Sequence, residues 1–180
     1  MTFQQKLVIM SALSAIIGAG TIARMPGSAL RAGPLARFGG VTAVSLAIVA
    51  IALAAVGVVS HTPIRHAVQI TPVVVALILA IRRSSVANAA AAPVFAFWLV
   101  IMGAIWLFLL GLARIVSGTF TAVEILLTIV IGLASVVGLA AAYRRGSTAS
   151  AAVRFATVIF FAIFQFAAMW LSVQPYIARR

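Results

Sequence analysis

The chain has 180 residues, of which 65% are hydrophobic and 8% are charged, with 13 basic side chains, one acid and no cysteine. A water-soluble domain needs about a quarter of charged residues to cover its surface, so this composition excludes one and predicts an all-α polytopic transmembrane bundle. The absence of cysteine excludes disulfides and thiolate metal sites. With two histidines and one carboxylate, most hydrolytic and metal-dependent reactions lack their groups. We therefore predict a single integral membrane domain over residues 1–180 that is not an enzyme, with no catalytic residue, metal or cofactor.

Six segments are long and apolar enough to cross a bilayer, which takes about 20 residues of helix. In chain order they are Leu7–Ala23, Val41–Ser60, Pro63–Ile81, Pro93–Ala113, Ala122–Ala142 and Val153–Val173. The first resembles a secretory signal, but we interpret it as a signal-anchor helix. The third contains Pro72, which should bend that helix or delay its start.

The links between six spans fall into two sets that differ in charge. The richer set should face the cytoplasm of a bacterial-type inner membrane and contact anionic headgroups, which places both termini outside. It comprises Arg24, Arg31, Arg37, Arg82, Arg83, Arg144, Arg145 and Arg154. The other set comprises Lys6, Arg65, Arg114, Arg179 and Arg180. No basic face carries interleaved aromatic residues, so we do not expect nucleic-acid binding.

Residues 80–90 match residues 142–152 without a gap, each with an arginine pair followed by small residues. We interpret this as a trace of three tandem helical hairpins. Chance similarity between strings rich in alanine and valine is the alternative.

Small residues at steps of three and four predict which helices pack tightly, because membrane helices associate through close backbone approach. The three series are Ser11, Ala15, Ala19 and Ala23; Ala43, Ala47, Ala50, Ala54 and Gly57; and Gly132, Ser135, Gly138 and Ala142. The fourth and sixth spans are bulky and aromatic, and we expect them to face lipid or fill gaps, with Trp98 at the interface. A groove for a carotenoid, a quinone or a partner helix is the alternative.

Glu124 is the only acid, and Thr121 precedes it at the spacing of a capping box, which predicts a helix cap. A functional carboxylate is the alternative, because His66 and Gln69 fall at the same end of the bundle. The spacing of His61 and His66 does not place two metal ligands on one helical face. Gln165 lies in the middle of the sixth span, and a polar side chain there is expected to form an interhelical hydrogen bond. A place along a substrate path is the alternative.

Two functional hypotheses follow. The first is an accessory or structural subunit of a larger inner-membrane complex, whose partner is another membrane protein or a second copy of this chain. The second is a compact six-helix transporter or channel with Glu124, His66 and Gln69 at its mouth and Gln165 along its path.

Overall fold

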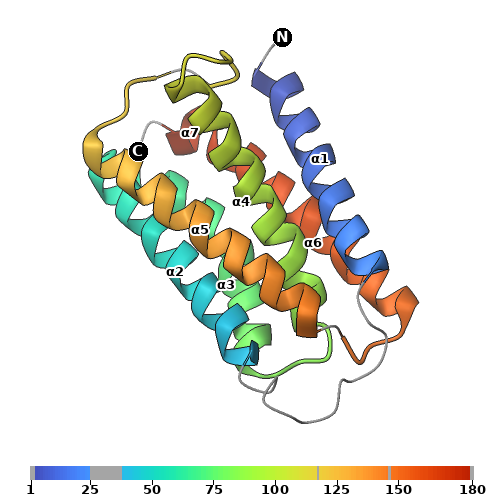
Figure 1. Ribbon diagram of the computed structural model, residues 1–180. Coiled ribbons are helices and arrows are strands. Elements are labelled where there is room, and N and C mark those ends of the chain that lie inside the picture. The colour runs from blue at the N-terminus through green and yellow to red at the C-terminus, as the bar shows by residue number, and fades with distance from the viewer. Residues whose placement is uncertain (1–2, 25–37, 117, 146, 179–180) are drawn as a thin grey trace.

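The computed structural model describes residues 3–24, 38–116, 118–145 and 147–178 of the chain. Its helices are α1 (Phe3–Ala23), α2 (Phe38–Val59), α3 (Pro63–Ile81), α4 (Ala87–Leu109), α5 (Ala122–Arg145), α6 (Ala151–Ser172) and the single turn α7 (Pro175–Ala178). Within the described ranges, α1 to α6 are long and apolar enough to cross a membrane. The predicted helical bundle with six spans is thus confirmed, and the protein is an integral membrane protein (Figure 1).

The innermost helix is α4, which contacts α1, α3, α5 and α6 (Figure 1). Every side chain from Ala89 to Trp98 on it is buried. The small alanines let the neighbouring helices approach, while Phe95, Phe97 and Trp98 fill the centre of the bundle. Of the two roles expected for the aromatic residues of the fourth span, these three fill gaps between helices and do not face lipid. Trp98, with 2% of its surface exposed, is a core residue and not part of an interfacial belt.

Both ends of α4 differ from the predicted bounds Pro93 and Ala113. The helix begins at Ala87 because its alanines are strong helix formers and Pro93 is tolerated inside it. It ends early because Gly111 adopts a left-handed φ of 73°. The Gly111 N–H donates to the Phe108 carbonyl (3.0 Å) and the Leu112 N–H to the Leu107 carbonyl (2.9 Å), as in a Schellman motif.

The third helix starts at Pro63 as predicted and continues through Pro72 to its end. A delayed start at Pro72 is therefore wrong. Thr62 is the residue that precedes the helix, but its side chain makes no capping bond. Its hydroxyl instead lies 3.1 Å from Nδ1 of His66.

The predicted small-residue face of α5 is buried as a whole, from Gly132 through Ser135 and Gly138 to Ala142. The ring of Phe95 occupies the space that a Cβ atom on Gly138 would need. This face therefore packs directly on the central helix, as the spacing predicts.

The faces predicted for the first two spans are displaced around their helices. On α1, Ser14, Gly18 and Ile22 are buried, whereas Ala23 is exposed. A Cβ atom on Gly18 would lie 3.2 Å from the Cα atom of Pro93, so α1 packs on α4 at this point and lies at the edge of the bundle.

On α2, the buried residues are Thr42, Ser45, Leu46, Val49, Ala52, Leu53 and Gly57. Of the predicted alanine series, Ala54 is exposed and the others are half-buried. The reason is that α2 lies between α3 and α5, so its larger residues fill the space between three helices.

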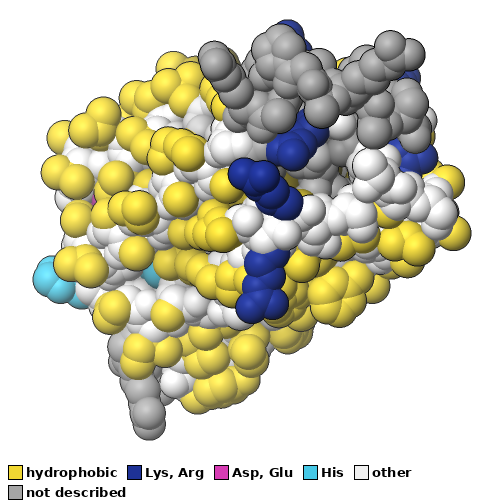
Figure 2. Space-filling model, turned by 90° about the horizontal axis from the view of Figure 1, so that it is seen from below, with side chains coloured by type: hydrophobic (Ala, Val, Ile, Leu, Met, Phe, Trp, Pro, Cys, Tyr) yellow, Lys and Arg dark blue, Asp and Glu magenta, His cyan; other side chains and the backbone are white. Residues whose placement is uncertain are grey.

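One end of the bundle carries a cluster of arginines, which Figure 2 shows as dark blue side chains among apolar ones. The described members are Arg24, Arg82, Arg83, Arg144, Arg145 and Arg154. Lys6, Arg65 and Arg114 lie at the opposite end, where α1 begins and α6 ends (Figure 1). Arg31, Arg37, Arg179 and Arg180 lie outside the described residues. Because each span crosses the bundle, successive links lie at alternate ends, and this places the two sets of basic residues at opposite ends.

The two links that match in sequence also meet in space. The Ser147 hydroxyl donates to the Ser85 carbonyl at 2.6 Å, and these two serines occupy equivalent positions in the sequence match. The main helix contacts do not follow the hairpin order. Helix α2 packs chiefly on α5 and α3, whereas α1 packs chiefly on α4. The sequence match therefore corresponds to a contact between two links at the arginine-rich end, but the helices do not pack as three tandem hairpins.

Candidate functional site

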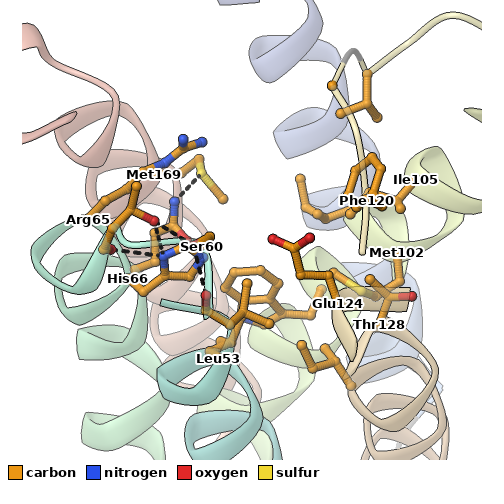
Figure 3. Close-up of a pocket in the computed structure, with 18 of the residues that line it drawn as sticks. Leu53, Ser60, Arg65, His66, Met102, Ile105, Phe120, Glu124, Thr128 and Met169 are labelled. Atoms are coloured by element: carbon orange, nitrogen blue, oxygen red, sulfur yellow. Dashed lines mark hydrogen bonds between the residues drawn. The ribbon is translucent and has the colours of Figure 1, made fainter. Parts of the chain in front are cut away.

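A cavity of about 440 Å³ lies at the end of the bundle away from the arginine cluster. Residues of α1 to α6 and of the link between α4 and α5 line it (Figure 3). It brings together Glu124, His66 and Gln69, three of the four residues that the sequence places at a mouth or path. Lys6 and Arg65 line it as well, although neither is among those four residues.

The wall formed by α3 carries two basic groups of the cavity, Arg65 and His66. Nδ1 of His66 lies 3.1 Å from both the hydroxyl and the carbonyl oxygen of Thr62. The Thr62 hydroxyl lies 2.7 Å from that of Ser60, which extends the polar group into the link after α2. Arg65 is half-buried, and its Nε atom has no hydrogen-bond partner in the described part of the chain.

Glu124 projects into the cavity from the opposite wall, at the start of α5, and faces His66 and Ser60 across the gap (Figure 3). The predicted capping box is present. The Thr121 N–H and hydroxyl donate to Oε2 of Glu124 at 2.8 and 2.9 Å, and the Glu124 N–H donates to the Thr121 hydroxyl at 3.3 Å. Capping and facing the cavity are therefore not alternatives, since one carboxylate does both.

Two buried amides differ in how well they are bonded. Gln69 is 4% exposed, and its Nε2 donates to the Ser172 hydroxyl at 2.9 Å, which ties α3 to α6. Gln165 is fully buried, does not line the cavity, and has no partner for its amide nitrogen or oxygen among the described residues. The predicted interhelical bond of Gln165 is therefore wrong, because the core around it, which includes Phe161 and Met169, is apolar.

The link between α4 and α5 covers one side of the cavity. The Lys6 ammonium donates to the Arg114 carbonyl at 3.2 Å, so the start of α1 holds this link in place. Trp106 Nε1 donates to the Thr128 hydroxyl at 3.0 Å and joins α4 to α5 just inside the bundle. The residues that contribute from the link are Ile115, Val116, Gly118, Thr119 and Phe120.

Deep in the cavity the lining is apolar. Leu53, Met102 and Ile131 line it together with Trp98, whose Nε1 has no described partner. No group of three or more His, Cys, Asp or Glu side chains in the described ranges could hold a metal ion. The arrangement offers charge and hydrogen bonding near the mouth and apolar contact below, which suits binding of a small amphipathic molecule.

Comparisons of the chain with protein-family models, with curated proteins and with solved structures found no match.

Proposed function

We propose that this protein is a compact membrane carrier that takes a small solute into the cavity lined by Arg65, His66 and Glu124. The observation that supports it is the gathering of scarce polar groups. Ionisable side chains inside a membrane protein are costly and usually serve a solute or ion path. Here the single carboxylate of the chain faces a basic wall across a cavity.

A carrier fits the arrangement better than an open channel. Below the cavity lies the fully buried part of α4, including Phe95 and Phe97, and the small-residue face of α5 packs on it. A solute that enters the cavity can reach the other side only if these helices move against each other, as in alternating access. The proposed role involves no making or breaking of covalent bonds.

We expect a cysteine at the cavity floor to react from both sides of the membrane if the protein is a carrier. Met102→Cys in the naturally cysteine-free chain should react with a charged, membrane-impermeant thiol reagent added outside or trapped inside proteoliposomes. Gly103→Cys is the control, since Gly103 is the neighbour of Met102 in the sequence but is exposed on the outer face of the bundle. The measurement is the rate of modification by mass spectrometry. Reaction of Met102→Cys from one side only would count against alternating access.

We also propose that the arginine-rich end faces the cytoplasm of a bacterial-type inner membrane, so that the cavity opens outward. The rule that basic links stay in the cytoplasm supports this orientation. Single cysteines at Ser84 and Thr148 should then both be protected from an impermeant reagent in intact cells and react after permeabilisation. Thr148 is exposed, whereas Ser147 is buried and bonded to the Ser85 carbonyl. Labelling of either cysteine in intact cells contradicts the orientation, and labelling of one alone contradicts the six-span topology.

An accessory role in a larger complex is our second proposal. It is supported by a shallow groove of about 530 Å³ on the outer face of the bundle between α2 and α5. Small residues in this groove, such as Gly40, Ser45 and Ala134, would let a partner helix or a second copy approach closely. Mild extraction followed by mass spectrometry tests it, and a stoichiometric partner is the supporting result.

A further inference from the structure

Two residues of opposite charge line the cavity from different helices. Glu124 projects from α5 and Arg65 belongs to the opposite α3 wall (Figure 3). The carboxylate accepts hydrogen bonds from Thr121, and Nε of Arg65 has no partner in the described ranges. Separated charges in an apolar surrounding are costly, and a molecule that contacts both would lower that cost.

Three other polar side chains of the cavity already make hydrogen bonds. Lys6 donates to the Arg114 carbonyl, Nδ1 of His66 contacts Thr62, and the Gln69 amide donates to Ser172. A ligand that contacts opposite charges on two walls would meet the Arg65 guanidinium on one and the unfilled acceptor capacity of the Glu124 carboxylate on the other. A simple anion would leave Glu124 uncompensated, and a simple cation would leave Arg65 uncompensated.

From this juxtaposition we propose that the cavity binds a small zwitterion with an apolar side group, which is the chemistry of a free apolar amino acid. The proposal rests on the carrier function and names its class of substrate. The ligand carboxylate contacts Arg65, which can bind it through two parallel hydrogen bonds. The ligand ammonium contacts Glu124.

The lining below these charges selects the rest of the ligand. Leu53, Met102 and Ile131 offer only apolar contact, and Nε1 of Trp98, which also lines the cavity, has no partner among the described residues. A side group with several polar atoms would lose its hydration there without replacement. At about 440 Å³ the cavity lies at the small end of ligand sites, which suits a single small molecule.

The test is binding of radiolabelled leucine to the full chain in lipid nanodiscs, with two competitors that keep its apolar body. 3-Methylbutylamine carries only the ammonium, and 4-methylpentanoate carries only the carboxylate. We expect unlabelled leucine to displace the label and each competitor to be at least tenfold weaker. Glu124→Gln and Arg65→Gln should each lower the affinity for leucine at least tenfold.

Two features keep the experiment interpretable. Glutamine also completes a capping box, so Glu124→Gln removes the charge and keeps the start of α5. Arg114→Gln is the control for Arg65→Gln, because it removes the same charge at the same end of the bundle from a residue that does not line the cavity. Thermal unfolding of each variant confirms that it is folded, and Arg114→Gln should bind leucine as the natural protein does.

The outcomes separate the ligand class from the carrier function. Equal affinity for the amine or the acid overturns the zwitterion but leaves the cavity as a solute site. Failure of all three probes to bind also overturns it, and the two-sided reactivity of Met102→Cys then decides the carrier function independently. Unchanged leucine binding in Glu124→Gln and Arg65→Gln overturns the proposed contacts.

Discussion

Replacement of Gly138 by leucine is expected to lower the free energy of unfolding by about 3 kcal/mol, the upper part of the usual range for an overpacked core. The ring of Phe95 fills the space beside Gly138 so closely that even a Cβ atom would overlap it. Phe95 is fully buried on the central helix, in contact with the main core. It cannot move aside without displacing other core residues, so α4 and α5 must separate.

The measurement is thermal or denaturant-induced unfolding in detergent, with Gly103→Leu as control. A Cβ atom on Gly103 would meet nothing within 4 Å, so leucine there should be neutral or slightly stabilising through helix propensity. Because the clash is with one ring, Phe95→Ala should recover part of the loss when combined with Gly138→Leu, which is a non-additive result. Equal stability of the two leucine variants would show that the α4–α5 contact is absent.

The face that contains Gly138 illustrates what could be predicted from the sequence. On α5 one series of small residues stands alone, so spacing identifies the packed face. On α1 two series compete, since Ser14 and Gly18 follow the same step of four as Ser11, Ala15 and Ala19. Only the tertiary contact of Gly18 with Pro93 selects between them. Spacing within one helix carries no information about that partner.

The interior position of α4 has little signal in the sequence, for a related reason. Lipid tails and protein interiors are equally apolar, so hydrophobicity does not distinguish a lipid-facing helix from a central one. The run of alanines from Ala89 to Ala92 is a weak indication that neighbours approach closely there. The aromatic residues that follow it suit either environment, and Trp98 was expected at the interface for that reason.

The candidate site was partly predictable, because topology decides which residues share an end of the bundle. Glu124, His66 and Gln69 follow from counting spans. Arg65 falls at the same end by the same count, but it was not included among the path residues, since a basic residue near a helix end usually serves orientation. The contact of Lys6 with Arg114 joins residues 108 positions apart, and no local pattern marks it. Gln165 shows the opposite case, in which a polar residue at mid-span has no partner among the described residues.

Replacement of Gln165 by methionine is expected to raise the free energy of unfolding by about 2 kcal/mol. The amide is fully buried, and both of its polar atoms lack partners among the described residues. A buried unsatisfied group costs about 1–3 kcal/mol, and an apolar residue of similar shape removes that cost. Methionine has nearly the same length and flexibility, so the packing against α3 and α4 should survive.

The same substitution at Gln69 should have the opposite sign, which makes it the matched control. Gln69 is also a buried amide in a spanning helix, but its bond to Ser172 would be lost, at a cost of about 1 kcal/mol. Unfolding of both variants in one detergent therefore separates an unpaired amide from a paired one. A loss of stability in Gln165→Met would mean that Gln165 has a partner, such as a bound water or solute. Gln165 would then again be a candidate for the solute path through the membrane.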